Sequence, residues 1–212
     1  MVLRIEDPRG LANRGRDLED LLRKCNMEYR RMGMATVAKI PTEWLPIRNS
    51  RGKVIDCKVT EKAPMDFMGS CRLQNGICLT VAFDAKKTID PRLPLDRVTE
   101  NQAEWLTDNE KSGGASFVLG CYNDERYYVI PWPIWSAAQK AHQADNKKTA
   151  SINVVELPSV MQAAWNRTEV DYLEVVDRLW DQDNWRWRET SLLERTKTVR
   201  GGGTKRTRRA SA

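Results

Sequence analysis

The segment Ile77–Asp84, with the sequence ICLTVAFD, constrains the fold of this chain more than any other feature. It is almost continuously apolar and rich in β-branched residues, which predicts a strand buried on both faces. Ala115–Tyr122, with the sequence ASFVLGCY, has the same character. Strands of this kind belong to sheets that helices cover, so a layered α/β fold is expected.

In the rest of the chain, segments whose apolar residues have the spacing of a helix are interleaved with segments that have the pattern of a strand. A helix is predicted over about Leu11–Met32, where apolar residues recur at i, i+3, i+4 and i+7, and Gly33 ends it. Thr99–Glu110 predicts a second helix, with Thr99 as its cap and Gln102 at capping-box spacing. Pro133 opens a third, short helix. Further strands are expected over Ala35–Ile40, Lys53–Thr60, Met65–Cys71 and Arg126–Ile130. This order indicates a mixed central β-sheet flanked by helices.

Composition divides the chain into three parts. Residues 1–142 hold the interleaved strands and helices, with a basic, turn-rich arm at about 41–64. Residues 143–194 are predicted to form a helical C-terminal extension, because Val170–Trp180 is amphipathic and four tryptophans lie around it. Residues 195–212 form a basic tail that three glycines make flexible.

The net charge of +6 is distributed unevenly. The tail 195–212 carries seven basic residues and no acidic residue, and residues 1–60 carry 13 basic against 8 acidic ones. Residues 150–194 carry 4 basic against 9 acidic ones. A polyanion would meet the first and last regions, although a charged tail is also what a solvated, disordered chain end looks like.

Several classes of protein are disfavoured. The five cysteines form no CxxC pair and the single histidine, His142, has no partner nearby, so no zinc-site spacing is present and the thiols are expected to be reduced. No apolar run is long enough for a bilayer, and the first ten residues lack a signal-peptide core. We therefore expect a cytoplasmic protein without membrane contact, whose metal, if any, is held by carboxylates.

The residues that point to chemistry are Asp66, Asp84, Ala85 and Lys86. Hydrolysis of a phosphodiester needs a hard cation with oxygen ligands, and that cation is Mg²⁺ or Mn²⁺ in such sites. Asp66 and Asp84 can supply carboxylates, and the carbonyl of Ala85 lies between Asp84 and Lys86. Because residues i and i+2 of a strand share a face, Lys86 points to the side of Asp84, where it can hold the attacking water or stabilise phosphate charge.

A D-x-K triplet alone is common and usually marks a solvated strand end. Here the charges end a strand that is too apolar for the surface, which is where α/β folds bind ligands. Asp66 precedes them on a neighbouring predicted strand, and Glu19 lies at the margin of the first helix's apolar stripe.

A series of motifs in chain order resembles the RecU family of Holliday junction resolvases. Asn13-Arg14-Gly15 followed by Glu19 is similar to the family's opening, and Lys39-Ile40-Pro41-Thr42 to its exit into a protruding stalk. Asp66-Phe67-Met68-Gly69 resembles D-Y-x-G, and Phe83-Asp84-Ala85-Lys86-Lys87-Thr88 resembles F-E-A-K-E-T. Pro94-Leu95 and Gln102 match the segment around the family's H-Q pair, and Tyr127–Pro131 matches a later strand. The matches cover about residues 13–137.

The resemblance implies a restriction-endonuclease-like (PD-(D/E)XK) core. It implies paired nicking of four-way DNA junctions by a homodimer with Mg²⁺ or Mn²⁺. The implied site consists of Glu19, Asp66, Asp84, Lys86 and Gln102, with the metal on Asp66, Asp84 and Ala85. Residues 41–64 would be the stalk, and the implied DNA contacts are Arg14, Arg48, Arg51 and Lys53.

The chain departs from the family pattern at two positions of the site. Asp84 stands where the family has Glu, and Asn101 replaces the His before Gln102. Two site residues also have simpler interpretations: Glu19 can pair with Arg23 on the helix surface, and Gln102 can be only the capping partner of Thr99. At the level of function, a nuclease for flap, branched or duplex DNA and a non-catalytic junction-binding protein remain alternatives.

Overall fold

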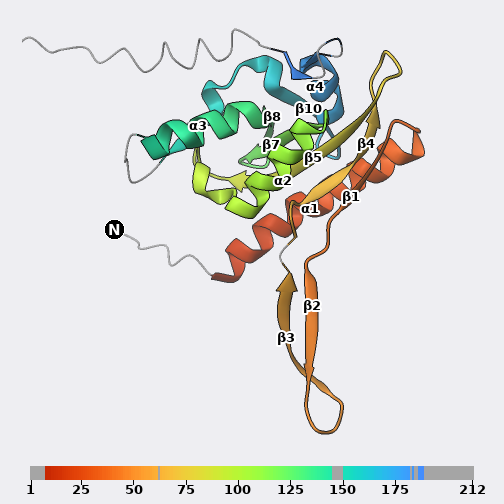
Figure 1. The fold of residues 1–212 in the computed structure, drawn as a ribbon, viewed down its shortest axis with the longest axis vertical. Coiled ribbons are helices and arrows are strands. Elements are labelled where there is room, and N and C mark those ends of the chain that lie inside the picture. Colours follow the sequence, from red (N-terminus) through yellow and green to blue (C-terminus); the bar gives the residue numbers. More distant parts are fainter. Residues whose placement is uncertain (1–7, 62, 145–149, 182, 184–185, 189–212) are drawn as a thin grey trace, which may run out of the picture.

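The computed structural model describes residues 8–61, 63–144, 150–181, 183 and 186–188. Its centre is a seven-stranded mixed sheet in the order β1-β4-β5-β7-β8-β10-β11 (Figure 1). The central strands β5 (Cys78–Thr88) and β7 (Ala115–Tyr122) run parallel, and every other neighbouring pair of this sheet is antiparallel. The other strands of the sheet are β1 (Ala35–Lys39), β4 (Phe67–Arg72), β8 (Arg126–Pro131), β10 (Gln162–Trp165) and β11 (Val170–Asp171).

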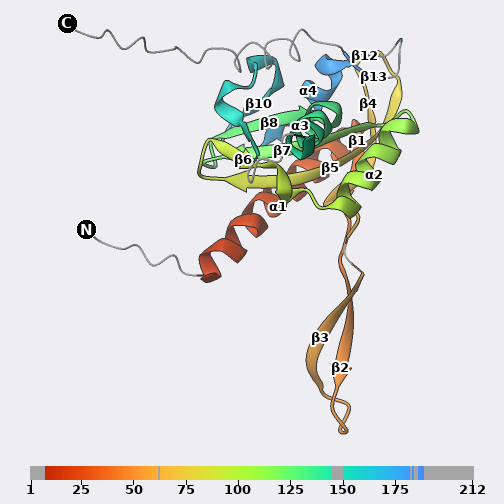
Figure 2. The same cartoon turned by 60° about the vertical axis from the view of Figure 1, so that its left-hand side comes forward.

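Helices cover both faces of the sheet. The described residues form the α-helices α1 (Pro8–Arg31), α2 (Glu100–Lys111), α3 (Trp132–Ala144) and α4 (Tyr172–Leu179). Short 3₁₀ turns occur at η1 (Leu95–Arg97), just before α2, and at η2 (Val154–Glu156) and η3 (Ser159–Met161), between β9 (Ser151–Asn153) and β10. In Figure 2, α2 and α3 lie on one side of the sheet and α1 on the other. The predicted mixed α/β fold with flanking helices is confirmed.

Successive side chains of β5 point to opposite faces of the sheet and so belong to two different cores. Val81 and Phe83 belong to the core beneath α1 and α4, whereas Ala82 belongs to the core beneath α2 and α3. Val81, Ala82 and Phe83 are all fully buried. The expectation of a strand buried on both faces is therefore met, and the next even residue, Asp84, faces α2.

A stack of phenylalanines fixes the register of the central strands. Phe67 of β4, Phe83 of β5 and Phe117 of β7 are direct cross-strand neighbours. Their ring centroids are 4.9 and 4.6 Å apart with nearly parallel planes. Tyr172 of α4 lies against both Phe83 and Phe117, and its hydroxyl donates to Asn26 of α1 at 2.7 Å. The stack thus joins three strands and two helices in one interaction.

In the part of the chain that the structure describes, three two-stranded pairings lie outside the main sheet. The largest is a ribbon of β2 (Glu43–Arg48) and β3 (Val54–Glu61), which projects away from the body as a long arm (Figures 1 and 2). This is the arm expected at residues 41–64. The others are β6 (Arg92–Pro94) with β9 (Ser151–Asn153), and β12 (Trp180–Asp181) with β13 (Arg186–Trp187).

The structure differs from the sequence-based expectation at two places. β5 does not end at Asp84 but continues to Thr88, because its parallel partner β7 pairs with it as far as Tyr122. In the described residues that follow α3, α4 is the only α-helix, whereas β10 and β11 complete the main sheet and Val170 and Tyr172 are buried in its core. These strands of four and two residues are too short for periodicity to reveal them. The tail 195–212 lies outside the described residues.

The half-buried carboxyl group of Glu110 ties the C-terminal segment to α2. Its Oε1 accepts hydrogen bonds from the Ser116 N–H at 2.8 Å and from the Trp187 indole at 2.6 Å. Burial raises the pKa of Glu110 to about 7, although both hydrogen bonds favour the ionised form and lower it.

Three of the cysteines, Cys25, Cys71 and Cys121, are buried, and all five are free. Among the described residues, no helix is both long and apolar enough to cross a membrane.

Gly69 is expected to be irreplaceable in β4. A Cβ atom built at Gly69 would lie 2.6 Å from Cα of Val37 and closer still to the Thr36 carbonyl oxygen. Gly69→Ala should therefore force β1 and β4 apart and lower the free energy of unfolding by about 3 kcal/mol, at the upper end of overpacking costs. Urea unfolding measures this, with Ser70→Ala on the exposed side of the same strand as the control. Equal stability of the two variants would contradict the close approach of the strands.

Glu110 should make stability depend on pH. Its folded-state pKa lies above the ordinary value, so the folded state binds the extra proton and stability falls as pH rises from about 4.5 through about 7. Glu110→Gln keeps the accepting oxygen and removes the charge, so it should be more stable than the wild type at pH 8, by about 1–3 kcal/mol, and equally stable at pH 4. Thermal unfolding at the two pH values tests this. A variant less stable than the wild type at pH 8 would show that the ionised form is the one the fold favours.

Candidate active site

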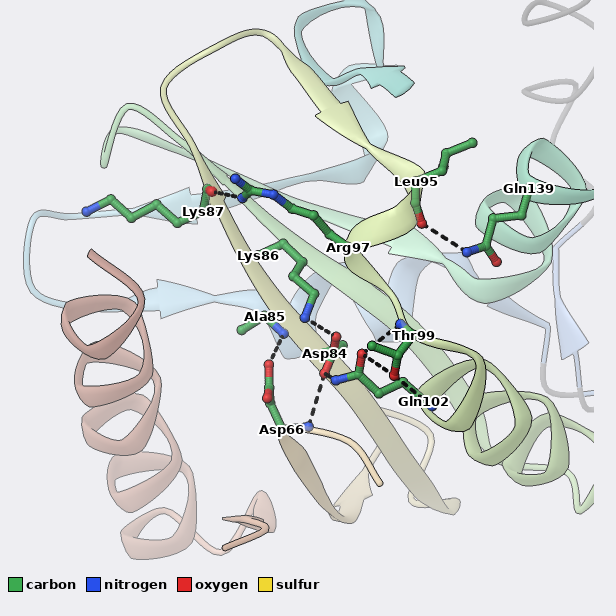
Figure 3. Close-up of polar contacts among 10 residues, drawn as sticks. All are labelled: Asp66, Asp84, Ala85, Lys86, Lys87, Leu95, Arg97, Thr99, Gln102 and Gln139. Atoms are coloured by element: carbon green, nitrogen blue, oxygen red, sulfur yellow. Dashed lines mark hydrogen bonds and ion pairs between the residues drawn. The ribbon is translucent and has the colours of Figure 1, made fainter. Parts of the chain in front are cut away.

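Asp66 and Asp84 are brought together by the register of β4 and β5. Phe67 is paired with Phe83, so Asp66, one residue earlier, lies opposite Asp84. The Asp66 N–H donates to Asp84 Oδ1 at 3.2 Å, and the Ala85 N–H donates to Asp66 Oδ2 at 2.9 Å. Each carboxylate therefore accepts a hydrogen bond from a main-chain N–H of the segment that carries the other carboxylate (Figure 3).

Lys86 lies on the same face of β5 as Asp84. Its ammonium group forms an ion pair with Asp84 Oδ2, as i and i+2 spacing on a strand allows. The Lys86 side chain is 16% exposed and that of Asp84 is fully buried. The pair thus sits at the boundary of the core, with Lys86 between the buried carboxylate and solvent.

Gln102 of α2 contacts the same carboxylate from the other side. Its Nε2 donates to Asp84 Oδ1 at 2.9 Å, while its Oε1 accepts from the Thr99 N–H at 3.0 Å and from the Thr99 hydroxyl at 3.2 Å. Because Thr99 occupies the amide oxygen, the amide nitrogen is left to face Asp84 (Figure 3). Gln102 is therefore both the capping-box partner of Thr99 and a contact of Asp84, two roles that the sequence presented as alternatives.

The environment of Asp84 disfavours its charge. Burial raises the pKa of Asp84 to about 7, the nearby Asp66 carboxylate adds to the rise, and Lys86 opposes it. Two neighbouring carboxylates with one buried are costly to keep ionised without a compensating cation. Among the described residues, Lys86 is the one cation that pairs with these carboxylates, so the site would hold an excess of negative charge with both of them ionised.

Glu19 approaches this region but does not join the two aspartates. Its carboxylate forms an ion pair with Lys39 at the end of β1, and Lys39 is paired with Phe67, next to Asp66. The expected alternative, a pair with Arg23, is not formed, since Arg23 lies 3.9 Å from Asp20 instead. Within the described ranges, no three side chains of His, Cys, Asp or Glu converge as a metal-binding group.

The basic residues of the arm lie far from the carboxylates, at the tip of the ribbon. Arg48 donates to the Gly52 carbonyl at 2.9 Å, and the Asn49 side chain accepts from the N–H groups of Arg51 and Lys53, both at 3.0 Å. These bonds shape the tip and leave the three basic side chains exposed. Arg14 lies in α1, but its side chain is outside the described part of the chain.

Sequence reasoning overlooked the contact of Lys39 with Glu19. Lys39 ends a strand in which buried and exposed residues alternate, and nothing in its own neighbourhood identifies a partner twenty residues earlier. The pairing depends on how α1 crosses β1, which is a property of the tertiary structure. Trp135 of α3 is fully buried and packs in the core beneath α2 and α3.

Comparison with known proteins places this arrangement in a family. The model of the recombination protein U family, RecU, matches residues 13–178. A Holliday junction resolvase RecU from Streptococcus pneumoniae (strain Taiwan19F-14) is 23% identical over 179 residues, which are 81% of this chain and 87% of the relative. The enzyme of the same name from Bacillus pumilus is 24% identical over 182 residues, which cover 83% and 86%.

Among solved structures, Hjc of Archaeoglobus fulgidus, a Holliday junction resolvase, is 13% identical with a TM-score of 0.34, over 54% of this chain and 76% of that one. The family match extends from α1 to α4, across all the residues that meet at Asp84. The chain belongs to the recombination protein U (RecU) family.

Proposed function

We propose that this chain is a metal-dependent DNA endonuclease that resolves four-way junctions. The observation that carries the proposal is the convergence of Asp66, Lys86 and Gln102 on the buried carboxylate of Asp84. The relatives named above are Holliday junction resolvases. The site of action we propose is the cytoplasm.

The donor set at Asp84 fits a hard divalent cation such as Mg²⁺ or Mn²⁺. Asp66 and Asp84 offer carboxylate oxygens, and the excess negative charge would be relieved by a cation. Since the N–H and C=O of one strand residue point toward the same neighbour, the carbonyl of Ala85 would share the side on which its N–H meets Asp66. A bound cation would acidify a water molecule and neutralise charge on the phosphate.

The remaining residues have roles that follow from their contacts. Gln102 and the Asp66 N–H both donate to Oδ1 of Asp84, so they orient the carboxylate and leave Oδ2 for Lys86 or a cation. Lys86, on the same face of β5 as Asp84, would direct its ammonium group toward the attacking water or the phosphate oxygens. Glu19, held by Lys39 beside Asp66, is proposed as an outer residue of the site.

The arm and its charged tip favour a branched substrate. Arg48, Arg51 and Lys53 are exposed at the end of the ribbon, and no carboxylate among the described residues pairs with them. A basic protrusion of this kind suits phosphate contacts within an open junction. We include Arg14 of α1 as a further DNA contact.

A homodimer is proposed because the ribbon leaves apolar side chains uncovered. Leu45, Ile47, Val54 and Ile55 are between 42% and 62% exposed. A two-stranded ribbon is marginally stable alone in water, and a second copy of the chain would cover these residues. Two-fold symmetry would also supply the two active sites that paired nicks require.

Substitutions at the centre of the site should abolish cleavage without abolishing the fold. Asp84→Asn and Lys86→Ala should each reduce Mg²⁺-dependent cutting of synthetic four-way junctions at least about 100-fold, because each removes a charge from the reacting region. Asp108→Asn and Lys111→Ala, an exposed pair on α2, serve as charge-matched controls. The assignment fails if both central variants cut as fast as the wild type. Parallel assays with flap and duplex DNA separate a resolvase from a nuclease of other specificity.

Neutralising the tip of the arm should weaken binding to junctions. The triple change Arg48→Gln, Arg51→Gln and Lys53→Gln should lower the affinity of catalytically inactive Asp84→Asn protein for a four-way junction about tenfold or more, since three phosphate contacts would be lost. The control removes three exposed basic residues from the body of the protein instead: Arg72→Gln, Lys111→Gln and Arg126→Gln. An equal loss of affinity in the two triple variants would rule out a specific role of the arm.

A further inference from the structure

Three cationic side chains gather around the end of β5, and they differ in their partners. Lys86 is paired with Asp84, and Lys87 on the opposite face is paired with Asp124. Arg97 of η1 donates from its guanidinium to the main-chain carbonyl of Lys87 (Figure 3). Among the described residues no carboxylate pairs with Arg97, so it is the cation of this group whose charge is not locally neutralised.

The turn that carries Arg97 is firmly anchored. Leu95 and Val98, on either side of it, are each only 4% exposed in the core beneath α2 and α3. The Leu95 carbonyl accepts from Gln139 of α3 at 2.9 Å, and the Leu95 N–H donates to Ala150 at 3.0 Å. Thr99 then begins α2. Arg97 is therefore exposed on a backbone that is fixed at both ends, unlike a side chain on a loose loop.

Two contacts connect the neighbourhood of Arg97 to residues of the site. Its acceptor, the Lys87 carbonyl, directly follows Lys86 on β5, and Thr99, two residues beyond Arg97, holds the amide of Gln102. Arg97 thus lies in the segment of chain that leads from Lys86 of β5 to Gln102 of α2. One donor of the planar group is used by the carbonyl, and the remaining donors are available for an oxyanion.

We propose that Arg97 binds a backbone phosphate of the DNA strand that is cut, next to the scissile phosphodiester. The inference rests on the proposed nuclease function. An anchored arginine without a carboxylate partner is suited to bidentate binding of phosphate, and its fixed position would set where the strand lies relative to Asp84. Arg97 is accordingly a substrate-binding residue, distinct from the basic residues at the tip of the arm.

The test compares Arg97→Gln, Arg97→Lys and Arg72→Gln in a four-way junction assay with Mg²⁺. Arg72 is an exposed arginine at the far end of β4, paired with Cys78, and so about 20 Å along the sheet from Asp84. Arg97→Gln should lower kcat/KM at least about tenfold, Arg97→Lys should lose less, and Arg72→Gln should match the wild type.

Binding supplies a readout that a structural role for Arg97 would not change. In the inactive Asp84→Asn background, Arg97→Gln should reduce the slope of log K against log[salt] by about one, and Arg97→Lys should keep the slope. Thermal unfolding of each variant shows whether loss of the bond to Lys87 disturbs the fold. If the wild type cuts and Arg97→Gln leaves both rate and slope unchanged, or if both Arg97 variants fall equally in rate and melting temperature at an unchanged slope, the assignment is wrong. If the wild type cuts no DNA, the proposed function fails and this inference fails with it.

Discussion

The register between β4 and β5 is the constraint on which the rest of the site depends. A shift of one residue would turn Asp84 from the α2 side of the sheet to the α1 side, into the apolar core beneath α1 and α4. The stacked rings of Phe67, Phe83 and Phe117 oppose such a shift, because any slip would separate all three. The polar site and the aromatic stack lie on opposite faces of the same strands, so the apolar side fixes the position of the charged side.

The fold stabilises the carboxylate of Asp84 although its burial is energetically unfavourable. A fully buried acid is costly, and its raised pKa reflects this. The protein offsets the cost with the Asp66 N–H, the Gln102 amide and the Lys86 ammonium. Each of these is positioned by something else: the β4–β5 register, the helix cap at Thr99 and the alternation of β5. The site is therefore an extension of the secondary structure and not a set of independent side chains.

The arm, unlike the body, is not held by a hydrophobic core. Its strands pair only with each other, its tip is shaped by the Asn49 side chain, and its apolar residues remain exposed. The body is built around two apolar cores, and at their margin the partly exposed Lys86 covers the buried Asp84. This arrangement fits a protein that would contact its substrate at two distant places. The basic tip of the arm would bind by charge and shape, and the residues around Asp84 would carry out the reaction.

The sequence by itself determined the elements that local patterns encode. Apolar runs predicted β5 and β7, the i, i+3, i+4 spacing predicted α1, and the Thr99–Gln102 spacing predicted the cap of α2. The spacing of Asp84 and Lys86 predicted their shared face. Only the tertiary structure decided which partners meet across the chain: Asp66 with Asp84, Glu19 with Lys39, and β10 with β8. Such contacts depend on strand order and helix crossing, which no window of neighbouring residues contains, because they form only when distant segments bury a common surface.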